Sequence, residues 1–181
     1  MSQSVFDVIV IGAGPGGYVA AIRCAQLGLK TAIIEREHMG GICLNWGCIP
    51  TKAMLRSAEV FHLMHRANEF GLNAEKISFD LDAVIKRSRG ISKQLNQGVT
   101  HLLKKNKVKS FIGDATILDK GKVKVEKNDN SEELSCSNII IASGARAREL
   151  PGLEADGELV WTYKHALTPS RMPKKLLVVG S

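Results

Sequence analysis

Two nearly continuous apolar runs lie near the N-terminus, separated by a glycine-rich turn and an alanine-rich segment. Residues 5–11 are apolar and largely β-branched apart from Asp7, and residues 31–34 form the second run. Continuous apolar runs are typical of parallel strands that are covered on both faces. Residues 18–29 predict a helix between the runs, ending near Gly28. The pattern therefore predicts a βαβ unit.

Two further helices are predicted after a loop over residues 36–46. The first runs from about residue 50 to 67, and the second follows an N-cap at Ser78 or Asp80. Apolar residues in the second helix recur mainly at spacings of three and four: Leu81, Val84, Ile85, Ile91, Leu95, Val99, Leu102 and Leu103. This spacing is typical of an amphipathic helix. We expect the two helices to pack together as an excursion from the sheet over about 50–107.

Beyond the second helix the hydrophobic period changes to two, which is the period of strands. Short strands are predicted at residues 109–112, 115–118 and 123–126. They indicate a small β-meander over about 115–137. Residues 138–142 form another apolar run and end in Ser143 and Gly144. Such a run is typical of a buried strand whose end approaches a ligand.

These elements together predict an α/β fold. We expect a Rossmann-like domain over residues 1–150, with a parallel sheet, the helical excursion and the small β-meander. Residues 151–175 contain several Pro and Gly and predict a connecting segment. Residues 176–181 repeat the apolar run and glycine of the first strand, and they predict the first strand of a second domain.

The net charge of +7 comes mainly from one stretch. Residues 83–113 contain eight Lys or Arg and no acid, and no aromatic side chain interleaves these charges. We expect the basic residues to lie largely on the solvated face of the amphipathic helix, and we expect no nucleic-acid partner. No apolar run approaches the roughly 20 residues of a membrane helix, and no secretion signal is evident. The sequence predicts a cytoplasmic protein without a membrane partner.

The first candidate site is a glycine motif, Gly12-x-Gly14-x-x-Gly17, directly after a strand and at the start of a helix. Gly12 allows a tight turn, Gly14 lets the backbone approach a pyrophosphate, and Gly17 lets helix and strand pack closely. Glu35 closes the second strand, where a carboxylate can accept hydrogen bonds from ribose hydroxyls. The arrangement indicates a dinucleotide site and does not distinguish FAD from NAD. The alternative is a glycine turn with a surface glutamate.

The second candidate site is a close cysteine pair, Cys43 and Cys48. Zinc needs about four ligands, and no second cysteine or histidine pair stands at suitable spacing, so we expect no metal. Residues five apart in a regular helix point about 140° apart. A disulfide between the two therefore requires a loop or a distorted turn, which Gly47 and Pro50 permit.

Two interpretations of this cysteine pair remain open from residue types alone. A helix N-terminus and the neighbouring Lys52 would lower the pKa of a thiol, which favours redox chemistry. The alternative is two buried, inert thiols. The remaining cysteines, Cys24 and Cys136, are expected to pack as small apolar groups.

Residues 40–52, GGICLNWGCIPTK, resemble the redox-disulfide signature of the flavoprotein disulfide reductases, the class I pyridine nucleotide-disulfide oxidoreductases. Within that family they are most similar to the members that oxidise dihydrolipoamide. The resemblance extends to Gly-Asp-Ala at 113–115 and to residues 140–145. Trp46 stands where relatives commonly carry a smaller residue, and Ser143 where they commonly carry Thr.

The resemblance implies FAD as the dinucleotide and NAD as the final electron acceptor. It implies a role in FAD binding for Gly12, Gly14, Pro15, Gly16, Glu35, Arg36, Gly41, Cys43, Lys52, Gly113, Asp114, Ala115, Ser143 and Gly144. It also implies that Cys43 and Cys48 form the redox disulfide. Cys43 would then be the thiol that exchanges with substrate, and Cys48 the thiol beside the flavin.

The implied activity is oxidation of protein-bound dihydrolipoamide to lipoamide with reduction of NAD. The implied partners are the lipoyl domains of 2-oxo acid dehydrogenase complexes and, in a full-length protein, a second copy. By the same resemblance, residues 176–181 begin a truncated NAD-binding domain. Residues 1–181 alone are therefore expected to be inactive. The alternatives are a glutathione or mercuric reductase, or a non-catalytic FAD-binding fragment.

Overall fold

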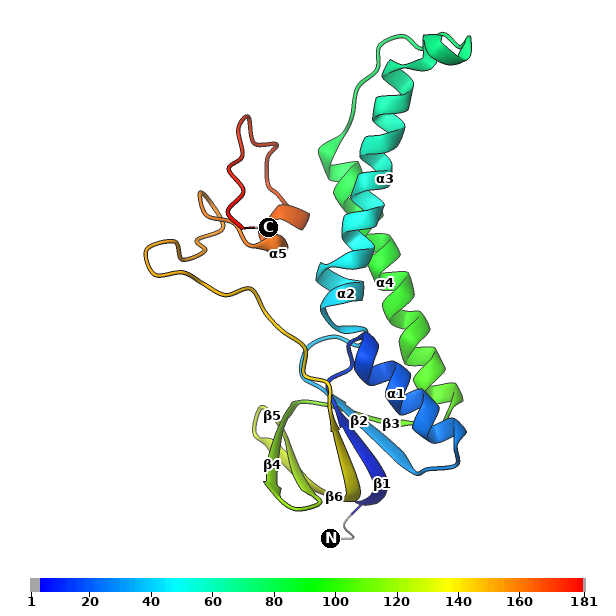
Figure 1. The fold of residues 1–181 in the computed structure, drawn as a ribbon, viewed down its shortest axis with the longest axis vertical. Coiled ribbons are helices and arrows are strands. Elements are labelled where there is room, and N and C mark those ends of the chain that lie inside the picture. Colours follow the sequence, from blue (N-terminus) through cyan, green and yellow to red (C-terminus); the bar gives the residue numbers. More distant parts are fainter. Residues whose placement is uncertain (1–3, 181) are drawn as a thin grey trace.

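A computed structural model describes residues 4–180 and contains a six-stranded sheet from which a long helical hairpin extends (Figure 1). The strands are β1 (Ser4–Ile11), β2 (Thr31–Glu35), β3 (Lys109–Ile112), β4 (Asp114–Asp119), β5 (Lys122–Lys127) and β6 (Asn130–Ile141). Their order in the sheet is β3-β2-β1-β6-β5-β4. The pairs β3–β2, β2–β1 and β1–β6 are parallel. The pairs β6–β5 and β5–β4 are antiparallel. The α/β fold with a mainly parallel sheet and a meander is confirmed.

Strand β6 differs from the expected separate strand over 138–142. It is continuous over twelve residues: 130–135 pair with β5, and 134–141 pair with β1. One long strand thus joins the meander to the parallel sheet. Strand β3 precedes the expected meander over about 115–137 and pairs with β2 in the parallel part of the sheet.

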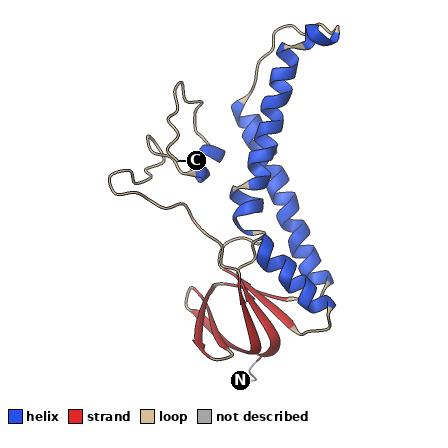
Figure 2. Cartoon of the chain, in the orientation of Figure 1, coloured by secondary structure: helices blue, strands red, loops and turns tan. Residues whose placement is uncertain are grey.

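The helices are α1 (Pro15–Gln26), α2 (Gly41–Trp46), α3 (Cys48–His65), the 3₁₀ helix η1 (Ala67–Phe70), α4 (Leu81–Lys105) and α5 (Tyr163–Leu167). Helices α3 and α4 lie side by side and form the hairpin (Figure 2). The expected start of the first helix at Tyr18 is wrong, because Pro15 occupies the first helical turn, where its missing N–H costs nothing. The expected loop over 36–46 is wrong in its second half, which forms α2. Asp80 caps α4 by accepting a hydrogen bond from the Ala83 N–H at 3.0 Å.

Apolar side chains fill both faces of the sheet. One face packs against α1 and α4. The core between this face and the helices includes Val10 and Ile33 of the sheet and Leu103 of α4. The other face is covered by the curled meander and buries Ile9, Ile34, Val123 and Leu134, among others. Strand β1 is therefore buried on both sides, as its continuous apolar run predicts.

Glycines allow three elements to pack closely against one another at the end of the sheet. Gly12 has a φ of +97°, and a Cβ there would lie 2.2 Å from the Ala142 carbonyl oxygen. A Cβ at Gly17 would lie 1.8 Å from the Gly12 carbonyl oxygen. The ends of β1 and β6 and the start of α1 therefore meet at distances that only glycine allows.

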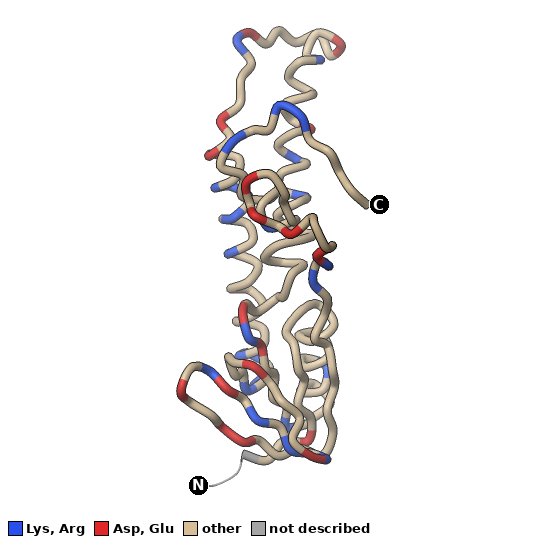
Figure 3. Tube along the Cα trace, turned by 90° about the vertical axis from the view of Figure 1, so that its left-hand side faces the viewer, with Lys and Arg blue, Asp and Glu red and all other residues tan. Residues whose placement is uncertain are grey.

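The basic residues of α4 lie largely on its solvated face, as expected: Arg89 is half-buried and the others are exposed. Lys and Arg mark the hairpin in Figure 3, and two of these side chains also bond to neighbouring helices. Arg87 donates a hydrogen bond to the Ala53 carbonyl oxygen at 2.8 Å, and Arg89 donates to the Asn45 carbonyl oxygen at 2.5 Å. They satisfy carbonyl groups on α3 and α2. None of the helices within residues 4–180 combines the length and apolar character of a membrane span.

The segment after β6 contains little regular structure apart from α5 (Figure 1). A strand is expected over 176–181, but residues 176–180 form none. The apolar side chains at 176–179 are 64–87% exposed. A strand needs a hydrogen-bonding neighbour, and these residues pair with no strand in the described part of the chain. Ser181 lies outside the described residues.

The close packing at Gly17 gives a direct test. We expect Gly17→Ala to lower the free energy of unfolding by about 1–3 kcal/mol or more, because the added methyl group meets the Gly12 carbonyl oxygen. The matched control is Gly16→Ala in the same helix, where no atom lies within 4 Å of the added Cβ. This control should stay within about 1 kcal/mol of the wild type, on the stabilising side. Urea unfolding measures both, and equal stabilities of the two variants would contradict the packing.

Candidate functional site

A cavity of about 160 Å³ opens where β1, β2 and β6 reach their carboxyl ends. Ligands of open α/β sheets bind in such crevices. Nine of the residues expected to bind FAD line it: Gly12, Gly14, Pro15, Glu35, Arg36, Gly41, Cys43, Ser143 and Gly144. The glycine motif and one cysteine of the pair therefore face the same cavity.

A second cavity of about 160 Å³ adjoins the first and shares Gly12, Glu35, Arg36 and Ser143 with it. It extends to residues 113–115, between β3 and β4. The two cavities together bring three further predicted residues, Gly113, Asp114 and Ala115, into one elongated site. Its shape suits a long ligand such as a dinucleotide.

Helix α2 begins directly against the glycine-rich turn. Gly41 has a φ of +58°, and a Cβ there would lie 2.6 Å from the Gly14 Cα. The Gly40 N–H donates to the Ala13 carbonyl oxygen at 2.8 Å. Helix α1 starts at this turn with no side-chain cap, so its first backbone N–H groups are available to an anion. The backbone thus forms a narrow, unobstructed cradle in which pyrophosphate fits.

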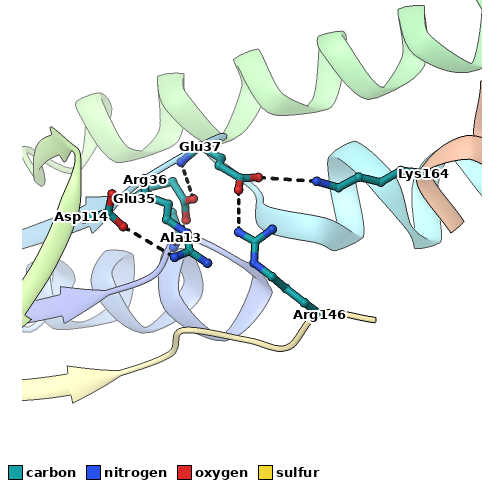
Figure 4. Close-up of polar contacts among 7 residues, drawn as sticks. All are labelled: Ala13, Glu35, Arg36, Glu37, Asp114, Arg146 and Lys164. Carbon is teal, nitrogen blue, oxygen red and sulfur yellow. Dashed lines mark hydrogen bonds and ion pairs between the residues drawn. The ribbon is translucent and has the colours of Figure 1, made fainter. Parts of the chain in front are cut away.

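The carboxylate of Glu35 is held by two backbone groups in the first cavity. One oxygen accepts from the Ala13 N–H at 2.8 Å and the other from the Glu37 N–H at 2.9 Å (Figure 4). Arg36 and Asp114 form an ion pair at 3.6 Å beside the second cavity. Glu35 is fixed at the position where a ribose-binding carboxylate is expected.

Sequence reasoning missed several residues that line the first cavity: Glu37, His38, Ile42, Trp46, Ala142, Ala145 and Arg146. Glu37 and Arg146 form an ion pair at 2.5 Å, and Arg146 lowers the pKa of the Glu37 carboxyl by its hydrogen bond and charge. These two residues are 109 positions apart in the chain. No local pattern links them, so only the fold reveals the pair.

The break between α2 and α3 brings the two cysteines together. Gly47 separates the helices, and a Cβ there would lie 3.1 Å from the Ile42 carbonyl oxygen. The Cys43 thiol lies close enough to Cys48 for the two to interact, and both are free thiols in this structure. The distorted turn that the sequence requires for a disulfide is therefore present.

Burial raises the pKa of the Cys43 thiol, and the hydrogen bond and charge interaction with Cys48 raise it further. The positive charge of Lys52 lowers it, but with less effect. The expected lowering of the pKa is thus wrong for Cys43, because desolvation of the thiolate outweighs the nearby cation. Lys52 acts on this thiol through its charge, and neither Lys52 nor Gly16 lines the two cavities.

Two asparagines position the start of α2. Asn45, 7% exposed, donates from its side-chain amide to the Met39 and Gly41 carbonyl oxygens at 3.0 and 2.8 Å. Asn96 of α4 donates to the Met39 carbonyl oxygen and to the Asn45 side-chain oxygen. This buried amide pair fixes the turn from which Cys43 enters the cavity. Within residues 4–180, no group of three or more His, Cys, Asp or Glu side chains could hold a metal ion.

Residues 6–181 match the family described as pyridine nucleotide-disulphide oxidoreductase. The chain belongs to this family.

The chain is 56% identical over 177 residues to a dihydrolipoyl dehydrogenase of Zymomonas mobilis, covering 97% of this chain and 38% of that protein. It is 52% identical over 197 residues to a dihydrolipoyl dehydrogenase of Rhizobium etli, covering 100% and 41%. The resemblance of the cysteine motif to the dihydrolipoamide-oxidising members is thereby confirmed, and the chain spans about two fifths of the length of these relatives.

Solved structures share the fold of this family member. LpdA from Mycobacterium tuberculosis has a TM-score of 0.81 at 24% identity, covering 89% of this chain and 37% of that one. A copper(II) complex of a mutant of RclA, an HOCl-induced flavoprotein disulfide reductase from Escherichia coli, has a TM-score of 0.76 at 22% identity, covering 92% and 35%. At these identities the likeness shows the fold alone.

The causes of the Cys43 pKa shift predict how its reactivity depends on pH. In the reduced chain, Cys48→Ala should lower the midpoint pH of Cys43 alkylation, because it removes the hydrogen bond and charge that disfavour the thiolate. Lys52→Met should raise the midpoint, because it removes a favourable positive charge. Iodoacetamide labelling followed by mass spectrometry of the Cys43 peptide measures both. Shifts in the opposite directions would contradict this electrostatic account.

Proposed function

We propose that this chain forms the FAD and disulfide portion of an NAD-dependent dihydrolipoyl dehydrogenase. The supporting observation is that the Cys43 side chain lines the same cavity as the glycine-rich turn while contacting the Cys48 thiol. A dinucleotide in that cavity would lie directly beside a dithiol. The names of the relatives support dihydrolipoamide as the substrate.

The residues proposed to hold FAD divide along the two cavities. Gly12, Gly14, Pro15 and Gly16 belong to the turn at the start of α1 and would contact the pyrophosphate. Ser143 and Gly144 approach the same region from the end of β6. Glu35 would accept hydrogen bonds from the adenosine ribose, with Arg36 and residues 113–115 near the adenine. Gly41, Cys43 and Lys52 would lie along the flavin arm.

The cysteine pair would exchange two electrons with a dithiol substrate. A dihydrolipoamide thiolate attacks the Cys43 sulfur of the Cys43–Cys48 disulfide, and Cys48 leaves as a thiolate. The second substrate sulfur then attacks the first, which forms lipoamide and releases Cys43. The raised pKa of Cys43 favours its return to the neutral thiol, with a proton from the substrate dithiol. FAD held along the two cavities would supply an acceptor for the two electrons of the dithiol and a hydride donor for NAD.

The proposal includes the wider setting of the protein. Lipoyl domains of 2-oxo acid dehydrogenase complexes would present the substrate, and a second copy would complete a homodimer. Residues 1–150 would form the FAD-binding domain and 151–175 a connecting segment. Residues 176–181, which form no strand here, would become the first strand of an NAD-binding domain where a neighbouring strand is present to pair with them. A cytoplasmic location fits the free thiols of Cys24 and Cys136, because disulfides are rare there.

Two-electron reduction of the FAD-loaded chain tests the position of the dithiol. We expect a long-wavelength absorbance band from a thiolate beside the flavin. Cys48→Ser should abolish the band. The matched variant Cys43→Ser should show the band before any reductant is added, because Cys48 is then a free thiol beside oxidised FAD, and lose it when two electrons reduce the flavin itself. A band that survives in Cys48→Ser, or its absence from the wild type, would show that the thiols are assigned wrongly.

The choice of reductant tests the substrate class. Dihydrolipoamide should reduce the oxidised, FAD-loaded chain and produce the same band, whereas glutathione at equal thiol concentration should not. Stopped-flow absorbance measures both reactions. Preferential reduction by glutathione would favour a glutathione reductase, and no reaction with either thiol would favour a non-catalytic FAD-binding protein.

A further inference from the structure

The ion pairs around Glu37 connect the loop after β2 to the segment after β6. Glu37 pairs with Arg146 at 2.5 Å and with Lys164 at 4.0 Å (Figure 4). Arg146 follows the end of β6, and Lys164 belongs to α5. One carboxylate therefore contacts two cations from a segment that lies far away in sequence.

Glu37 and Arg146 are part of the wall of the first cavity. The N–H of Glu37 also donates to Glu35, so the backbone of the loop is fixed beside the proposed ribose-binding carboxylate. Opening the Glu37–Arg146 pair would free Arg146 from the loop on the other side of the cavity, whereas Ala142 stays tied to β1, because its N–H donates to the Ile11 carbonyl oxygen at 2.8 Å. The pair thus sets the width of the cavity at this point.

Lys164 extends the connection to the helix that carries Cys43. Its ammonium group lies 5.7 Å from the centroid of the Trp46 ring, and the guanidinium of Arg89 lies 4.2 Å from the same centroid. Trp46 also lines the first cavity. Helix α5 is therefore held against α2 by a cation–π contact as well as by the ion pair with Glu37.

Regular secondary structure is sparse in the segment between β6 and α5, and most of its hydrogen bonds join residues close in the chain. Within residues 142–162 the only strand-like pairing is an isolated bridge between Leu150 and Leu153. Figure 1 shows this segment leaving the sheet, looping outward and returning beside α2. The electrostatic contacts at Glu37 and Trp46 are thus placed where they determine the path of the segment.

We propose that Glu37 is a positioning residue that holds Arg146 and the chain next to it at the wall of the dinucleotide cavity, with α5 tied to the same carboxylate through Lys164, and so slows the release of FAD. This role rests on the proposed function, because FAD is the group that the wall would retain. Glu37 acts through the position of the wall and does not take part in the chemistry.

The rate of FAD release measures the effect. On dilution of the FAD-loaded chain, the fluorescence of released FAD should rise about two- to fivefold faster in Glu37→Gln than in the wild type, the size expected for a half-exposed ion pair. The matched control is Glu59→Gln, which removes a 2.6 Å ion pair of similar exposure with Arg56 on α3, away from the cavity. This control should release FAD at the wild-type rate.

Salt dependence and a double-mutant cycle separate this role from a general loss of stability. Raising the salt concentration should accelerate release from the wild type towards the Glu37→Gln rate and change the variant less. Glu37→Gln combined with Arg146→Gln should release FAD no faster than the faster single variant, because both remove one interaction. Rates that multiply in the double variant, or a wild type insensitive to salt, would overturn the role.

Hydrogen exchange tests the position of the segment without any cofactor. Peptides covering residues 145–162 should exchange about two- to fivefold faster in Glu37→Gln than in wild type or Glu59→Gln. A wild type that binds no FAD but shows this difference would refute the proposed function and leave the positioning effect in place. If the chain binds FAD but Glu37→Gln changes neither the rate of FAD release nor the rate of hydrogen exchange, the role of Glu37 is refuted and the proposed function is not.

Discussion

The site depends on how closely the backbone packs at the glycine-rich turn. Gly12 lies against the end of β6, Gly17 lies against Gly12, and Gly41 lies against Gly14. Each of these contacts leaves no room for a Cβ. As a result, the start of α1, the start of α2 and the ends of two strands surround one cavity, and the backbone itself forms its floor.

The redox chemistry follows from that packing because the cysteines lie just beyond it. The same turn that places Gly41 against Gly14 starts α2, and two residues later Cys43 faces the cavity. Asn45 and Asn96 hold the turn from the opposite side, and Gly47 bends the chain so that Cys48 returns to Cys43. The polar network is buried, so each lost hydrogen bond would leave an unsatisfied group inside the protein.

Local patterns in the sequence were sufficient to predict most of the parallel sheet, and the family resemblance pointed to many of the residues that line the two cavities. The apolar runs of β1 and β2, the glycine spacing and the periodicity of α4 are determined by neighbours close in the chain. Continuity of β6 could not be predicted in the same way, because the polar residues before Asn138 conceal that one strand serves both halves of the sheet. The hydrogen bonds donated by Arg87 and Arg89 also depend on carbonyl groups of other helices.

The electrostatics of the site were the least predictable from sequence. A lysine four residues after Cys48 suggested an acidic thiol, but the sign of the Cys43 pKa shift is decided by burial, which only the fold determines. The Glu37–Arg146 pair likewise exists because β2 and β6 end on the same side of the sheet. The central claim is that this cavity holds FAD. The visible absorbance spectrum of the chain, taken after incubation with FAD and gel filtration, tests it most directly: flavin bands at about one FAD per chain are predicted, and a spectrum without them would contradict the account.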